Sequence, residues 1–91
     1  MLFMTTYDII GDRTSERTAA LMQVFGDRGE VEGTQAHYVR ADGGGGWVIQ
    51  EINDATKAYE DSLAYAEWLD IETVPIITID EAVPKILESL G

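Results

Sequence analysis

Residues 34–54 read TQAHYVRADGGGGWVIQEIND, a stretch with two candidate strands, the turn between them and the start of a helix. Residues 34–41 alternate moderately between polar and apolar side chains, and residues 47–52 are rich in aromatic and β-branched types that favour strands. Asp42 and the four glycines after it form a turn, so the sequence predicts an antiparallel hairpin. The Asn53-Asp54 pair predicts the start of a helix over residues 55–69, because either side chain can accept free amide hydrogens of the first turn.

The chain before the hairpin predicts one strand and one helix. Residues 2–9 are apolar and aromatic with interspersed threonines, a composition typical of a strand. Gly11 and Asp12 interrupt this strand. Either Asp12 or Thr14 can then cap a helix that continues to about Arg28, where glycines end the helical pattern.

The chain after the second helix predicts a strand and a short tail helix. Residues 70–79 form the last strand, and Pro75 within it favours an edge position because proline cannot donate a ladder hydrogen bond. Asp80 is expected to cap a helix over residues 81–90. Pro84 then falls within the first turn of that helix, where proline is tolerated.

The predicted element order is strand, helix, strand, strand, helix, strand and tail helix. This split βαβ pattern indicates an α+β, ferredoxin-like fold with a four-stranded antiparallel sheet and two helices on one face. We expect a single domain over residues 1–91. The other sheet face has no cover from this chain, and an apolar face left in water would be an unusually large exposed patch. We therefore expect a homodimer in which the sheet of a second copy covers that face.

The charge balance excludes two classes of partner. The chain has 17 acidic and six basic residues, which gives a net charge of −11. A surface with this much negative charge repels phosphate backbones and anionic lipids. We therefore expect neither nucleic-acid nor membrane binding. The absence of cysteine excludes disulfides and thiolate sites. Residues 1–8 contain no basic region and end on an acid, which is unlike a secretory signal, and we expect a cytoplasmic protein.

A set of short motifs spread over about residues 1–82 resembles a known family. The set comprises Met1-Leu2-Phe3-Met4, Asp42-Gly43, Gly45-Gly46-Trp47, Glu51, Asn53-Asp54, Trp68 and Thr73-Val74-Pro75. It resembles the small bacterial family called domain of unknown function 3303. The resemblance implies a fold similar to the dimeric α/β barrels, in which two ferredoxin-like sheets pack face to face. That superfamily includes cofactor-free monooxygenases, haem-degrading enzymes, small isomerases and proteins with no known activity, so the resemblance transfers no catalytic residue.

His37 is the only histidine and the only side chain that titrates near neutral pH by default. If residues 42–46 form the hairpin loop, Ala41 pairs with Trp47, and counting outward places His37 opposite Glu51. A carboxylate there would raise the proton affinity of the imidazole and orient its ring, as an acid–base pair requires. His37 and Glu51 are therefore the candidate catalytic residues; the alternative is a half-exposed strand histidine with a chance ionic partner.

The chain is rich in large aromatic side chains for its length. Tyr7, Tyr38, Trp47 and Trp68 are the candidates for lining a flat ligand. In the expected register Trp47 lies on the same face as His37 and forms an apolar wall beside it. The alternative is that these aromatic side chains serve core packing and dimer contacts.

No motif for a cofactor or a metal is visible, and we expect neither. One histidine without any cysteine cannot form a zinc site alone. The glycines at residues 43–46 are not followed by the Lys-Ser/Thr pair of a phosphate-binding loop, so they indicate a flexible hairpin tip.

Three functions remain open for a fold that hosts many. The first is binding of a small apolar or aromatic molecule, between sheet and helices or inside a dimeric barrel. The second is a cofactor-independent enzyme, similar to monooxygenases or isomerases, with His37 as proton acceptor and Glu51 as its orienting partner. The third is an interaction or scaffold module without a ligand. We place binding first because only one titratable cluster is visible. A deep apolar pocket holding His37 would favour the enzyme, and a filled interior would favour the interaction module.

Overall fold

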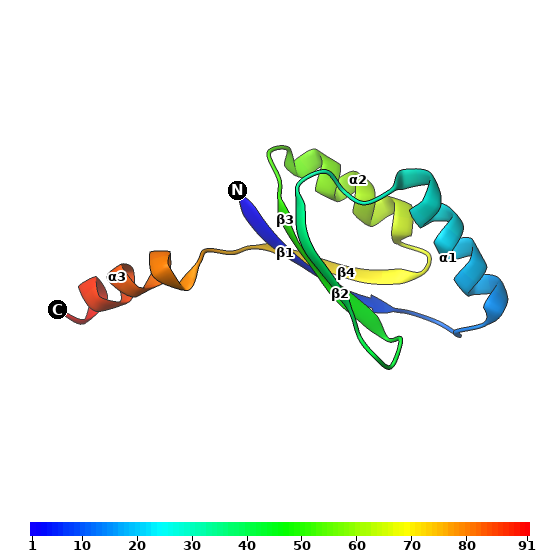
Figure 1. Cartoon of the computed structure of the whole chain (residues 1–91), viewed down its shortest axis with the longest axis horizontal. Helices are drawn as coiled ribbons and strands as arrows, with labels where there is room; N and C mark the ends of the chain where they lie inside the picture. Colours follow the sequence, from blue (N-terminus) through cyan, green and yellow to red (C-terminus); the bar gives the residue numbers. More distant parts are fainter.

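The computed structural model describes residues 1–91 and has the predicted order of elements (Figure 1). The elements are β1 (Leu2–Ile9), α1 (Ser15–Arg28), β2 (Thr34–Val39), β3 (Gly45–Glu51), α2 (Ala55–Tyr65), β4 (Leu69–Pro75) and α3 (Ile79–Leu90). The four strands form one antiparallel sheet in the order β2-β3-β1-β4. The predicted α+β, ferredoxin-like fold is therefore confirmed.

The two longer helices begin at side chains that the sequence marks as caps. Thr14 accepts a hydrogen bond from the backbone N–H of Arg17 at the start of α1, at 3.1 Å. Asp54 accepts one from the N–H of Thr56 at the start of α2, at 3.0 Å. Both helices lie against the same face of the sheet, and Figure 1 shows no helix over the other face.

Helix α2 is shorter than expected. It ends at Tyr65, and the chain turns through residues 66–68 before β4 begins. Trp68 therefore lies in this turn, where its N–H donates to the Tyr65 carbonyl. The turn comes early because the ladder between β1 and β4 extends to the pair of Ile9 and Leu69. Leu69 is a strand residue for that reason, and not the last helical one.

The last strand and the tail helix also differ from the expected boundaries. β4 ends at Pro75, and it is the edge strand that this proline predicts. Helix α3 begins at Ile79 and is capped by Thr78, not by Asp80. Pro84 is consequently the sixth residue of the helix, past the first turn, where proline removes a backbone hydrogen bond at a cost of about 3 kcal/mol.

The pairing of β2 with β3 differs by three residues from the expected register. His37 pairs with Val48, Tyr38 with Trp47, and Val39 with Gly46. The expected pair of His37 and Glu51 is therefore wrong. The physical reason is that the last two glycines of the run belong to β3, so the loop comprises residues 40–44 only.

The hydrogen bonds of the hairpin loop show how this register is held. The N–H of Gly43 donates to the Arg40 carbonyl at 3.0 Å, which closes a four-residue turn. The Asp42 carboxylate accepts a hydrogen bond from the N–H of Gly44 at 2.9 Å. The N–H of Arg40 then donates to the Gly45 carbonyl at 2.8 Å. The turn is thus complete before Gly45, and β3 begins there.

The fully buried part of the molecule is small and lies on one strand. Only four of 91 residues are fully buried, and all four are on β3: Gly45, Gly46, Val48 and Gln50. The accessible surface is 6559 Å², about 1,300 Å² more than the roughly 5,200 Å² typical of a folded chain of 10.0 kDa. Helix α3 extends away from the sheet, which contributes to this excess (Figure 1).

Candidate functional site

A cavity of about 320 Å³ lies between the covered face of the sheet and helices α1 and α2. Nineteen residues line it, of which eleven are hydrophobic. The strands contribute every second residue, as expected for one face of a pleated sheet. These strand residues are Thr5 and Tyr7, His37 and Val39, Val48 and Gln50, and Leu69, Ile71 and Thr73.

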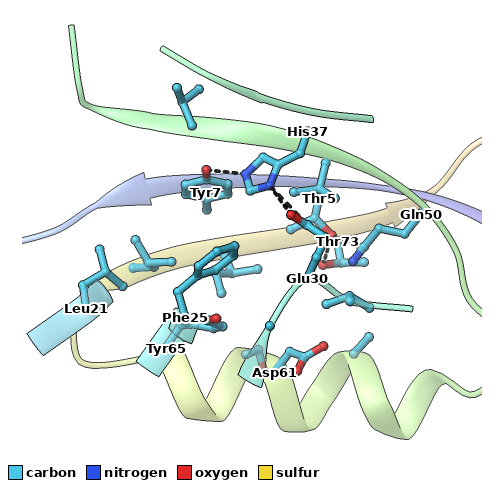
Figure 2. Close-up of a pocket in the computed structure, with 18 of the residues that line it drawn as sticks. Thr5, Tyr7, Leu21, Phe25, Glu30, His37, Gln50, Asp61, Tyr65 and Thr73 are labelled. Atoms are coloured by element: carbon cyan, nitrogen blue, oxygen red, sulfur yellow. Dashed lines mark hydrogen bonds and ion pairs between the residues drawn. The ribbon is translucent and has the colours of Figure 1, made fainter. Parts of the chain in front are cut away.

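The helices contribute side chains at helical spacing. Leu21, Met22 and Phe25 project from α1, and Ala58, Asp61, Ser62 and Tyr65 line the cavity from α2. Figure 2 shows the labelled members of this set on the helical side of the cavity, facing the strands. The remaining lining residues, Gly29 to Val31, come from the loop between α1 and β2.

A chain of three polar side chains lies at one wall of the cavity (Figure 2). The Tyr7 hydroxyl is 2.7 Å from Nε2 of His37. Nδ1 of the same ring is 3.2 Å from one carboxylate oxygen of Glu30 and 3.3 Å from the other. Because a carboxylate only accepts, the contact with Glu30 assigns a proton to Nδ1, and Nε2 without a proton accepts from the Tyr7 hydroxyl. The Tyr7 and His37 rings meet edge to face, with centroids 5.7 Å apart.

Gly46 makes the contact between Tyr7 and His37 possible. Tyr7 is on β1 and His37 is on β2, and β3 lies between these strands. Gly46 is the β3 residue paired with Tyr7. A Cβ at this glycine would lie 2.7 Å from Cζ of the Tyr7 ring, closer than side chains pack. The Tyr7 side chain therefore crosses β3 at a glycine, which has no side chain to block it.

A second polar chain crosses the sheet further along the cavity. The Thr5 hydroxyl donates to Oε1 of Gln50 at 2.8 Å and lies 2.9 Å from the Thr73 hydroxyl. Since the single hydroxyl hydrogen of Thr5 is used on Gln50, Thr73 is the donor to Thr5. Gln50 is only 7% exposed, so these bonds satisfy a polar side chain that is buried.

Burial beside the cavity raises the pKa of two of its tyrosines. Burial raises the pKa of Tyr7, and the nearby Glu30 carboxylate and Tyr65 raise it further. Burial likewise raises the pKa of Tyr65, which Arg28 partly opposes. Arg28 forms an ion pair with Asp61 that joins α1 to α2 at the rim of the cavity. Tyr7 is thus a neutral phenol and a hydrogen-bond donor at ordinary pH, and not a base.

The family model for "Domain of unknown function (DUF3303)" matches residues 1–90. The chain belongs to the DUF3303 family. The match includes every residue of the DUF3303 cavity and all of α3. A search of curated proteins gives no match. No helix of this DUF3303 domain is both long enough and apolar enough to span a membrane.

The DUF3303 cavity brings together two of the six predicted site residues, Tyr7 and His37. Glu51 lies at the end of β3, where its exposed carboxylate forms an ion pair with the amino terminus of Met1. It does not contact His37, so Glu30 occupies the place beside the imidazole that the sequence assigned to Glu51.

The three other aromatic candidates lie outside the cavity of the DUF3303 domain. Tyr38 and Trp47 are cross-strand neighbours on the uncovered face, because their pair alternates with that of His37 and Val48. The expected wall of Trp47 beside His37 is therefore wrong. Trp68 lies in the turn after α2 and is not among the lining residues.

Four polar residues of the site were not predicted from the sequence. Thr5 and Gln50 are two positions from Tyr7 and Val48 on their strands, so the strand period could have placed them on the same face. Thr73 follows from the same period on β4. Glu30 lies in a loop, and no periodic signal marks it. No group of three or more histidine, aspartate and glutamate side chains is placed to hold a metal ion.

Proposed function

We propose that the cavity binds a small, neutral and mostly apolar molecule that has at least one polar group. The observation that carries this proposal is the cavity itself, which is open, largely apolar and has two polar chains on its sheet side. Ligand sites typically have volumes of roughly 300–1,000 Å³ with a few placed polar groups, and about 320 Å³ suits a molecule of up to three rings. An interaction module would have no need of such an unfilled interior.

The charges of the lining residues define the ligand class further. No lysine or arginine lines the cavity, whereas Glu30 and Asp61 do. Arg28 neutralises Asp61, but Glu30 has only the His37 ring as its partner. A carboxylate or phosphate would therefore enter an apolar cavity without a cation to meet it, at a high desolvation cost. A neutral ligand with a hydroxyl or carbonyl group avoids that cost.

The test uses two fluorescent probes that differ by one charged group. N-phenylnaphthylamine is neutral, and anilinonaphthalenesulfonate is the same ring system with a sulfonate. We expect the neutral probe to bind and the sulfonate to bind at least tenfold more weakly, about 1.4 kcal/mol. Equal affinity for both probes would contradict the assignment of a neutral ligand.

A pair of variants on α2 locates the probe. Ala58→Trp fills the cavity and should abolish binding of N-phenylnaphthylamine, whereas Tyr59→Trp places the same side chain at an exposed position and should leave it unchanged. Circular dichroism and thermal unfolding check that both variants are folded. Unchanged binding in a folded Ala58→Trp variant would exclude the cavity as the binding site.

A specific observation favours a second candidate function, a proton-transfer enzyme. His37 lies in an apolar cavity, and the Glu30 carboxylate orients its ring, as in an acid–base pair. In this function His37 accepts a proton from a bound carbon acid, directly or through the Tyr7 hydroxyl, and returns it at another atom, as an isomerase does. Glu30 takes the orienting role first assigned to Glu51.

Nitrobenzisoxazole, a neutral aromatic molecule that opens when a base removes its ring proton, tests this second function. Proton-transfer catalysis predicts opening by the wild-type protein, a loss of at least tenfold in rate for His37→Gln, and an intermediate rate for Glu30→Gln. Glu51→Gln is the matched control and should retain the wild-type rate. A His37→Gln variant as fast as the wild type would exclude His37 as a base.

We also propose that the domain forms a homodimer through the uncovered sheet face. Tyr38 and Trp47 lie side by side on this face and are 68% and 37% exposed. Large aromatic side chains that are exposed in a single chain often form the centre of a protein interface. The few fully buried residues of the single chain support the same proposal, because a second copy would enlarge a thin core.

A further inference from the structure

Helix α3 has an apolar face that touches nothing in its own chain's folded body. Its apolar side chains recur at the spacing of one helical face and comprise Ile79, Val83, Ile86, Leu87 and Leu90. Their exposed fractions range from 41% at Val83 to 78% at Leu90. Figure 1 shows the helix extending away from the sheet, beyond the end of β4.

This helix has little stability of its own. Isolated helices shorter than about 12–15 residues are marginal in water, and α3 has 12 residues with Pro84 in its interior. The capping box formed by Thr78 and Glu81 defines where it starts but does not cover its apolar face. A helix of this kind is held by packing against another surface.

The link between β4 and α3 disfavours packing on the chain's own sheet. The N–H of Ile76 donates to the Leu2 carbonyl, which continues the ladder with β1 past Pro75. Only three residues, Ile76 to Thr78, separate β4 from α3, and the last of them is the helix cap. A return across the chain's own uncovered face would require a complete reversal within these three residues, the first of which still pairs with β1.

We propose that α3 docks on the uncovered sheet face of a second copy, over Tyr38 and Trp47, in a reciprocal exchange. The inference rests on the homodimer proposed above and specifies which element of the second copy covers the face. The excess surface of about 1,300 Å² exceeds the roughly 800 Å² per partner of a standard interface. A reciprocal exchange buries both unpartnered surfaces of each chain in one closed two-fold assembly.

Charge selects the half of the face that α3 contacts. The helix has three acidic residues, Asp80, Glu81 and Glu88, against one lysine. On the β4 side the uncovered face has Asp70 and Glu72, which would repel it. The β2–β3 side presents the aromatic pair of Tyr38 and Trp47, and its one strand carboxylate, Glu51 at the end of β3, is paired with the amino terminus of Met1. The apolar face of α3 therefore fits best over β2 and β3.

Sedimentation velocity of two double variants tests the role of the apolar face. Ile86→Ser with Leu87→Ser removes two of its side chains. Lys85→Ser with Glu88→Ser removes an ion pair on the opposite face, with the same new residues and no change in net charge. We expect a wild-type dimer at micromolar concentration, a dissociation constant raised roughly tenfold or more by the first pair, and little change from the second. A monomeric wild type, or equal effects of the two pairs, would overturn the proposal.

A spin label identifies the surface that α3 contacts, and the absence of cysteine makes a single label simple to place. Unlabelled copies with Ser89→Cys and an attached nitroxide are mixed with isotope-labelled wild-type copies. Docking in trans predicts broadening of the Tyr38 and Trp47 signals of the wild-type copies. A dimer without this broadening would overturn the docking of α3 but leave the homodimer standing. A wild-type chain that sediments as a monomer would overturn both, and probe binding in the cavity is measured independently of either result.

Discussion

Gly46 occupies the position in β3 where a side chain would separate Tyr7 from His37. The tyrosine ring passes over this glycine to reach the imidazole two strands away, and Glu30 holds the far side of that ring. The hydrogen bond between Tyr7 and His37 thus depends on residue 46 being a glycine. Because Gly46 is also fully buried, any added atom must be accommodated by neighbours that have little room to move.

Gly46→Ala should therefore destabilise the protein by about 1–3 kcal/mol, because the new methyl group overlaps both the Tyr7 side chain and the backbone carbonyl of Tyr38. It should also weaken binding of N-phenylnaphthylamine. Gly26→Ala is the matched control: a Cβ there meets nothing within 4 Å, and alanine in a helix interior stabilises by about 0.5–1 kcal/mol. Urea unfolding measures both effects. Similar stability of the two variants would contradict this account of Gly46.

Tyr7 also makes the free energy of unfolding depend on pH in the alkaline range. Its folded pKa is raised above the ordinary value of 10.0, first by burial and then by Glu30. Above about pH 10 the unfolded chain releases this proton while the folded protein retains it, so stability falls as the pH rises from 10 toward the folded pKa. Below that range the contribution is complete.

The Tyr7→Phe variant should accordingly lose less stability than the wild type between pH 9 and about pH 11. Urea unfolding midpoints at several pH values over this interval provide the measurement. Tyr59→Phe, at an exposed tyrosine of α2, controls for the loss of a phenol elsewhere. Parallel pH profiles for Tyr7→Phe and the wild type would show that burial of Tyr7 is not linked to folding.

The helices depend on their caps, because no residue of α1 or α2 is fully buried. Packing against the sheet is correspondingly light, and local hydrogen bonds at the helix starts contribute a larger share of their stability. Thr14 makes such a bond to the N–H of Arg17. Thr14 stabilises α1 and does not line the cavity. Its loss should therefore lower the stability of the protein without altering the chain of Tyr7, His37 and Glu30.

Thr14→Ala should cost about 1 kcal/mol, the usual effect of removing a threonine cap. Thr18→Ala, an exposed position inside the same helix, should be neutral or slightly stabilising because alanine is the better helix former. Thermal unfolding followed by circular dichroism compares the two variants. Equal melting temperatures would indicate that α1 does not start at Thr14 in solution.

At the element scale, the sequence predicted more of the fold than of the site. Strand and helix periodicity is local, so β1, α1 and the start of α2 follow from the residues that form them. The hairpin register depends on which of four successive glycines begins β3, and the residue types in that run do not distinguish them. The carboxylate beside His37 comes from a loop, where no period applies, so counting along the strands named Glu51 and could not find Glu30.

The whole molecule is elongated and strongly acidic. It measures 56 × 28 × 18 Å, and its radius of gyration of 15.8 Å exceeds the roughly 12 Å of a compact chain of this length. Helix α3 accounts for the extension (Figure 1). The net charge of −11 is spread over this shape, so self-repulsion opposes both folding and any approach of a second copy.

Sodium chloride should therefore stabilise the protein, because raising the ionic strength from 0.01 M to 1 M shortens the screening length from about 30 Å to about 3 Å. The melting temperature should rise over this range. Asp70→Asn combined with Glu72→Gln, which removes two charges from the uncovered face, should reduce the rise. A melting temperature independent of salt would mean that the net charge does not limit stability.

The burial of β3 alone has a consequence for how a molecule could reach the interior. The four fully buried residues are all on this strand, whereas none lies in the helices that roof the cavity. Local opening of the roof costs less free energy than opening of the sheet, so amide hydrogens of α1 and α2 should exchange with deuterium sooner than those of β3. Opening of this roof would widen the access that the cavity already has to solvent, so entry requires no tunnel through the sheet.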